Sequence, residues 1–147
     1  MGSSDISPVE VMKKHRVIAV VGASKNPEKD AYTVPAYLRD HGYTIIPINP
    51  TTDTVLGMRA YPGLRELPPS VASEVDVVNV FRPSEELPEI ARQTVELRNR
   101  SGQQVVFWAQ LGLENDEAKK ILEANGVPYV MNACMRVVHQ LHLAKRG

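Results

Sequence analysis

The sequence lacks several features that would assign it to a particular class of protein. Cys134 is the only cysteine, so no disulfide can form within the chain, as is usual for a reducing compartment. Neither sign of charge predominates, because 17 Lys and Arg residues balance 17 Asp and Glu residues. No apolar run approaches the length of a membrane span, and the polar residues 1–5 do not resemble a signal peptide. We therefore expect a cytoplasmic protein that binds neither nucleic acid nor a membrane.

The most informative stretch covers residues 17–27. Residues 17–21 are a short β-branched run, which is typical of a strand buried on both faces of a parallel sheet. Gly22 allows a sharp turn, and the small residues Ala23 and Ser24 allow a ligand to approach the main chain. A helix follows, so its N-terminus and Lys25 favour binding of an anion such as a phosphate. The dinucleotide pattern G-x-G-x-x-G is incomplete, however, and an ordinary strand-to-helix turn remains the alternative.

Strands and helices alternate along the rest of the chain. Pro35 places the first turn of the second helix near Thr33 or Val34. The pattern predicts a single α/β domain at 16–147, a Rossmann-like doubly wound parallel sheet of about five strands, preceded by an arm and helix at 1–15. The expected strands are 17–21, 44–48, 75–81, 104–108 and 128–131, with an edge strand at 59–61. The expected helices are 8–14, 34–41, 87–97, 116–125 and 135–143, with a helical turn at 64–67. Ser7 and Asn115 are the expected N-caps of the first and fourth of these helices.

In such a sheet the ligand lies beyond the carboxyl ends of the strands. The candidate segments are therefore 22–26, 49–52, 81–83, 109–112 and 132–134. The second strand ends in Asn49 and Pro50, where an NAD-binding domain has an acidic residue and an NADP-binding domain favours an arginine. Asp53 lies too far along the chain to serve. An NAD(P)-dependent oxidoreductase is accordingly the alternative and not the first hypothesis.

Several short motifs occur together in order across residues 15–140. They are VGAS at 21–24, NP at 26–27, VPAYL at 34–38, GY at 42–43, IPINP at 46–50, LG at 56–57, VD at 75–76, VFR at 80–82, WAQLG at 108–112 and NAC at 132–134. In these motifs the chain resembles the small bacterial and archaeal CoA-binding proteins, which are similar to the CoA-binding domain of the succinyl-CoA synthetase alpha subunit. The synthetase's second domain, with its phosphorylated histidine, would begin where this sequence ends, so the resemblance does not imply synthetase activity.

The resemblance implies that coenzyme A is the ligand and indicates which residues bind it. The loop after the first strand would take the phosphates, and the loop after the second strand would flank the nucleotide. Two further loops would lie near the phosphates and the pantetheine arm. The alternative interpretation is that Arg82 forms a salt bridge at the start of the following helix. The implied binding residues are Gly22, Ala23, Ser24, Lys25, Asn26, Asn49, Pro50, Phe81, Arg82, Pro83, Gln110 and Gly112.

Cys134 follows a strand end and is a candidate for a mixed disulfide with the CoA thiol. The alternative is a buried, unreactive cysteine. A metal site of Cys134, His139 and His142 is not expected, because no ligand-spacing motif supports it. Phe107 and Trp108 are adjacent in a strand and are expected to pack on opposite faces of the sheet.

The hypothesis is a CoA-binding or acyl-CoA-binding protein with no evident catalysis of its own. No Gly-x-Ser-x-Gly elbow or other catalytic arrangement is present in the sequence. An interaction module with a vestigial pocket is a further alternative. A homodimer is expected only from the general frequency of such assemblies.

Overall fold

The computed structural model describes residues 6–144 and contains one parallel sheet of five strands in the order β2-β1-β5-β6-β7. From β1 the chain first adds β2 on one side and then crosses to add the other three strands on the opposite side. The expected doubly wound sheet is confirmed, and its switch point lies between β1 and β5. The strands are β1 (Val17–Val21), β2 (Thr44–Ile48), β5 (Val77–Val80), β6 (Val106–Ala109) and β7 (Tyr129–Val130).

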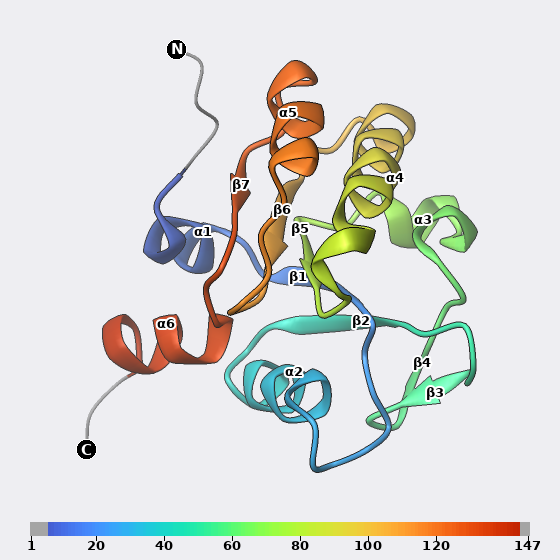
Figure 1. Cartoon of the computed structure of the whole chain (residues 1–147). Coiled ribbons are helices and arrows are strands. Elements are labelled where there is room, and N and C mark those ends of the chain that lie inside the picture. The colour runs from blue at the N-terminus through green and yellow to red at the C-terminus, as the bar shows by residue number, and fades with distance from the viewer. Residues whose placement is uncertain (1–5, 145–147) are drawn as a thin grey trace.

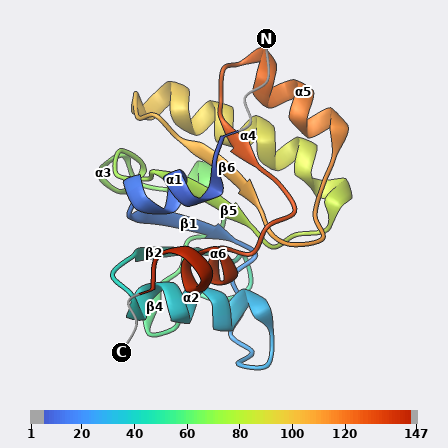
Figure 2. The same cartoon turned by 90° about the vertical axis from the view of Figure 1, so that its left-hand side faces the viewer.

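Helices cover both faces of the sheet (Figures 1 and 2). One face carries α1 (Pro8–Lys14), α2 (Asp30–Asp40) and α6 (Met135–His142). The other carries the 3-10 turn η1 (Leu64–Glu66) and the helices α3 (Pro69–Ala72), α4 (Leu87–Ser101) and α5 (Asp116–Ala124). A second 3-10 turn, η2 (Ser84–Glu86), leads into α4. No helix within residues 6–144 is long and apolar enough to cross a membrane.

Each face of the sheet builds its own hydrophobic core. Phe107 belongs to the core under α4 and α5, whereas Trp108 belongs to the core under α1, α2 and α6, as the alternation of a strand predicts.

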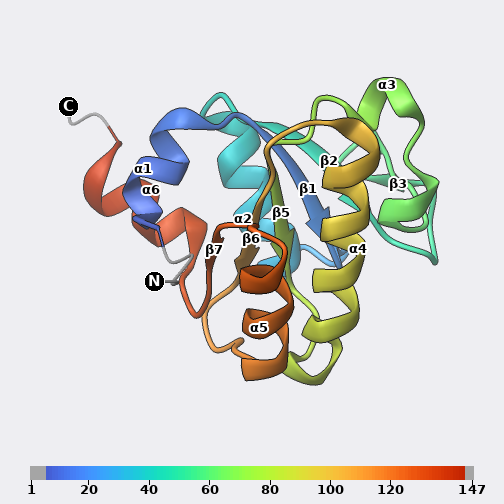
Figure 3. The same ribbon diagram turned by 90° about the horizontal axis from the view of Figure 1, so that it is seen from above.

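Helix α1 begins with the expected cap, in which the Glu10 amide donates to Ser7 Oγ at 3.3 Å. It lies beside α6 (Figure 3) and buries Val11 and Met12 in the second core. The separation of residues 1–15 from the rest stays a prediction, and the polar residues 1–5 lie outside the described part.

Helix α2 begins several residues earlier than expected, at Asp30, with Pro35 inside it. A proline has no amide N–H, so the carbonyl four residues before it has no partner within the helix. That carbonyl belongs to Ala31, and it accepts a hydrogen bond from the Ser24 amide at 3.2 Å. The proline therefore does not start the helix; it frees an acceptor that ties the loop after β1 to the first turn of α2.

The expected edge strand at 59–61 does not form as one strand, because its residues belong to two separate elements. Thr54–Val55 (β3) and Met58–Arg59 (β4) form a separate antiparallel hairpin. Tyr61 pairs with the end of β2, since its amide donates to Pro47 O at 3.0 Å and its carbonyl accepts from the Asn49 amide at 2.9 Å. The hairpin is thereby held at the carboxyl end of β2.

A cluster of aromatic rings joins α2 to α6 around His139, whose side chain is buried. His139 Nδ1 lies 2.8 Å from the Tyr37 hydroxyl, and the His41 ring centroid lies 5.2 Å from that of His139. Burial lowers the pKa of His139 below its usual value, with further lowering from the positive charges of His41 and Arg16.

We expect the free energy of unfolding to fall as the pH drops below about 6.5, the ordinary histidine pKa. The unfolded chain binds the His139 proton at a higher pH than the folded chain, so stability is lost as pH falls through the unfolded pKa and levels off below the folded one. Urea unfolding between pH 7.5 and 5 measures this. His139→Gln should flatten the profile, whereas His142→Gln, at an exposed position of the same helix, should not. An unchanged slope in His139→Gln would assign the pH dependence to other groups.

Candidate functional site

A hollow of about 750 Å³ lies at the carboxyl ends of β1, β2 and β5, beside the switch point. These strands end level with one another, because Val21 is paired with both Ile48 and Val80. The volume is within the usual range for small-molecule sites. We call this site the main hollow; its lining is Val21, Gly22, Ala23, Ser24, Lys29, Ala31, Ile48, Asn49, Pro50, Thr51, Pro62, Gly63, Leu64, Arg65, Glu66, Phe81, Arg82, Glu86, Ile90 and Gln93.

The loop after β1 forms one wall of the main hollow and requires glycine at its first position. Gly22 has a φ of +90°, a conformation that other residues rarely adopt. A Cβ atom there would lie 2.9 Å from Arg82 Cδ and 3.3 Å from Phe81 O. The absence of a side chain therefore lets the Arg82 stem cross the loop at van der Waals distance.

The same loop is held by its own side chains and presents main-chain donors. Ser24 Oγ accepts from the Asn26 amide at 3.0 Å, and Asn49 Nδ2 donates to Ala23 O at 2.8 Å. The amides of Ala23 and Ala31, both in the lining, have no acceptor within residues 6–144. Ala31 lies in the first turn of α2, where the helix dipole is positive. Free main-chain amides at a helix N-terminus favour the binding of an anion.

Arg82 lies in the main hollow and also makes the ion pair that the sequence allowed. Its Nε and Nη2 donate to the two carboxylate oxygens of Glu86 at 3.0 and 2.9 Å. This hydrogen bonding raises the pKa of Arg82 and lowers that of Glu86. The guanidinium is thus positioned at the wall of the hollow, with its charge shared with a carboxylate.

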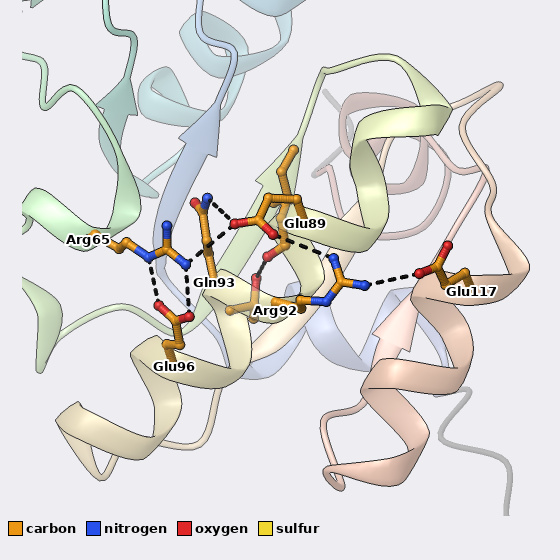
Figure 4. A network of polar contacts seen from close by, with 8 residues as sticks. Arg65, Glu89, Arg92, Gln93, Glu96 and Glu117 are labelled. Carbon is orange, nitrogen blue, oxygen red and sulfur yellow. Dashed lines mark hydrogen bonds and ion pairs between the residues drawn. The ribbon is translucent and has the colours of Figure 1, made fainter.

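Arg65 holds the opposite wall in place through a network on α4 (Figure 4). Its guanidinium binds Glu96 through two hydrogen bonds of 2.8 and 2.9 Å and reaches Glu89 at 3.4 Å. Arg92 extends the network to α5, with 3.0 Å between its Nη2 and Glu117 Oε2. Hydrogen bonding to Arg65 lowers the pKa of Glu96. These pairs are exposed, so we assign them the role of fixing η1 against α4 rather than a large share of the stability.

The structure brings together about half of the residues implied as CoA-binding. Those that line the main hollow are Gly22, Ala23, Ser24, Asn49, Pro50, Phe81 and Arg82. Those outside its lining are Lys25, Asn26, Pro83, Gln110, Gly112 and Cys134.

The residues outside the lining occupy nearby loops at the same edge of the sheet. Gln110 is buried, and its Oε1 accepts from the Met135 amide at 3.1 Å and from Asn79 Nδ2 at 3.4 Å. The Gly112 amide donates to Asn132 Oδ1 at 2.6 Å. Cys134 is the N-cap residue of α6, half-buried against the second core. Its disulfide with CoA stays a prediction.

Sequence reasoning missed Lys29, the N-cap residue of α2, and the wall formed by η1 and α4. Lys29 would have been identified as a candidate if α2 had been predicted to begin at Asp30. Arg65, Gln93 and Ile90 carried no sequence signal, because their segments are not adjacent to a strand end. No group of three or more His, Cys, Asp and Glu residues suited to a metal ion occurs within residues 6–144.

The family model described as "CoA binding domain" matches residues 16–140. The chain belongs to the CoA-binding domain family. The resemblance drawn from the sequence motifs is therefore confirmed, and it covers most of the chain.

Relatives fall into two groups. YneT of Bacillus subtilis, an uncharacterised protein, is 40% identical over 130 residues, which are 88% of this chain and 90% of YneT. The alpha subunit of an ADP-forming acetate–CoA ligase from Pyrococcus furiosus is 31% identical over 108 residues. That match takes in 71% of this chain but 22% of the ligase subunit, so the chain corresponds to a minor part of it.

The fold is also found in solved structures. A hypothetical protein from Pyrococcus horikoshii OT3 superposes with a TM-score of 0.83 at 31% identity, covering 98% of this chain and 97% of that one. This agreement supports the strand order described above and the doubly wound class.

Proposed function

We propose that this chain binds coenzyme A or an acyl-CoA in the main hollow and catalyses no reaction on it. The observation that carries the proposal is the set of positive groups at the switch point, where Lys29, Arg82 and the unpaired amides of Ala23 and Ala31 meet. CoA carries a diphosphate, and helix N-termini with free amides bind phosphates. Membership of the CoA-binding domain family favours CoA over other nucleotides.

The adenine and the pantetheine arm of CoA can contact apolar residues in the other walls of the main hollow. Pro50 and Pro62 offer flat apolar surface to the adenine, and Phe81 and Ile90 offer it to the pantetheine arm. The arm would then run towards Gln110 and Gly112, beyond the ends of β6 and β7. Pro83 and Cys134 would contact its distal part.

The lining of the main hollow contains two carboxylates, Glu66 and Glu86. Glu86 is hydrogen-bonded to Arg82, which lowers its pKa, whereas a general acid or base for neutral pH needs a raised carboxylate pKa. We therefore assign Glu86 the role of positioning Arg82 rather than a catalytic one. The cytoplasmic location and the homodimer stay predictions.

The first test is a thermal shift with CoA, acetyl-CoA, NAD, NADP and ATP. A ligand at ~100 times its dissociation constant adds about 2.7 kcal/mol to the free energy of unfolding. We expect CoA or acetyl-CoA to raise Tm by several degrees and NAD and NADP to leave it unchanged. A shift with NAD or NADP alone would reject the proposal in favour of an oxidoreductase. No shift with any ligand would favour an interaction module.

A pair of lysine variants locates the binding residue. Lys29→Met should reduce the CoA shift, because Lys29 lies in the lining of the main hollow. Lys25→Met is the matched control from the same loop, exposed and outside the lining. A larger loss of the CoA shift in Lys25→Met than in Lys29→Met would indicate that Lys25 contacts the phosphate, as the sequence predicted.

A further inference from the structure

A second hollow of about 630 Å³ adjoins the main hollow beside the β3–β4 hairpin. The two share Asn49, Pro50, Thr51 and Pro62, so a single ligand at the end of β2 can extend into both. We call the second site the side hollow; its remaining lining is Thr52, Asp53, Arg59 and Ala60.

Arg59 is the cation of the side hollow and differs from the two arginines of the main hollow. Arg65 and Arg82 are each ion-paired with carboxylates. Arg59 makes no ion pair with a carboxylate of residues 6–144; its guanidinium carbon instead lies 5.1 Å from the centroid of the Tyr61 ring. The ring fixes the direction of the guanidinium without neutralising its charge.

The main chain of the side hollow also offers donors. Two side chains of its loop are hydrogen-bonded within the loop: Asn49 Oδ1 accepts from the amide and the hydroxyl of Thr51, each at 2.7 Å, and Thr52 Oγ1 donates to Thr54 O at 3.1 Å. The amides of Thr52 and Asp53 have no acceptor in the described part of the chain. Two free amides and an unneutralised guanidinium therefore surround one hollow, which is the chemistry that binds a phosphate monoester.

We propose that the side hollow binds the 3′-phosphate of CoA and that Arg59 makes this chain selective for CoA over dephospho-CoA. The inference rests on the proposed binding of CoA in the main hollow. In doubly wound nucleotide-binding domains the residues after the second strand contact the substituents of the ribose. A ribose placed over Asn49 and Pro50, with its diphosphate at the β1 loop, would direct its 3′-substituent towards Arg59.

Asp53 is the one opposing group in the lining of the side hollow. Its carboxylate repels a phosphate dianion at close range. Asp53→Asn removes the charge and keeps the size of the side chain, so this variant should bind CoA more tightly while its affinity for dephospho-CoA stays the same.

Isothermal titration of CoA and dephospho-CoA tests the inference. We expect the natural chain to bind CoA about tenfold more tightly, the lower end of what hydrogen bonds to a charged group contribute. Arg59→Met should bring the two affinities together by weakening CoA alone, and Arg59→Lys should retain part of the difference. Arg98→Met, at a half-buried arginine near the end of α4 that lines neither hollow, is the matched control and should leave both affinities unchanged.

The outcomes separate the two proposals. Equal affinities in the natural chain, or an unchanged ratio in Arg59→Met, would overturn the role of Arg59 and leave CoA binding intact. No binding of either ligand would overturn the proposed function itself. Circular dichroism and the Tm of each variant confirm that an altered ratio does not arise from unfolding.

Discussion

Replacement of Gly22 by alanine is expected to lower the free energy of unfolding by about 2–4 kcal/mol, combining left-handed strain with overpacking. The φ of +90° must be kept by a residue with a Cβ atom, and that atom would press on Arg82 Cδ at 2.9 Å. Either the loop after β1 or the Arg82 side chain must move. CoA affinity should fall by more than about tenfold, because the Ala23 amide and the guanidinium lose their alignment.

Gly42→Ala is the matched control for this variant. Gly42 has a φ of +96°, but a Cβ atom added there would have nothing within 4 Å, so alanine introduces only the backbone strain. We expect a loss of about 1–2 kcal/mol in the free energy of unfolding and an unchanged CoA affinity. Urea unfolding and calorimetric titration measure both quantities. Equal losses of stability in the two variants would show that the contact with Arg82 contributes nothing.

Trp108→Phe should cost about 2–4 kcal/mol, through a cavity and an unpaired carbonyl. The indole is fully buried in the core under α1, α2 and α6. Its Nε1 donates to Ala133 O at 2.8 Å, which ties the strand β6 to the loop before α6. Phenylalanine fills only part of the space and provides no donor.

The CoA affinity of Trp108→Phe distinguishes a packing role of Trp108 from a role in ligand binding. Trp108 lies outside the lining of the main hollow, so CoA affinity should change little at temperatures where the variant is folded. Phe107→Leu is a suitable control, because Phe107 is equally buried on the other face and its side chain has no hydrogen-bonding group. A large loss of CoA affinity in Trp108→Phe alone would give the indole a part in binding.

Much of the fold could be predicted from short-range patterns. Apolar runs of β-branched residues marked the strands, and Ser7 and Asn115 marked helix starts through their caps, both of which the structure contains. The start of α2 was the exception. Its N-cap residue, Lys29, makes no side-chain cap hydrogen bond, and Pro35 gave a misleading start signal inside the helix.

The sequence by itself determined the doubly wound class, the family and the loops at the carboxyl edge of the sheet, because these depend on residues close together in the chain. Only the tertiary structure decided which side chains share a hollow. Arg65 reaches the main hollow because η1 packs on α4, and Arg59 reaches the side hollow because Tyr61 pairs with β2. Lys25 and Lys29 lie four residues apart, yet only Lys29 lines the hollow. Whether a side chain lines a hollow depends on contacts between segments that are distant in sequence. A pattern of neighbouring residues carries no information about those contacts.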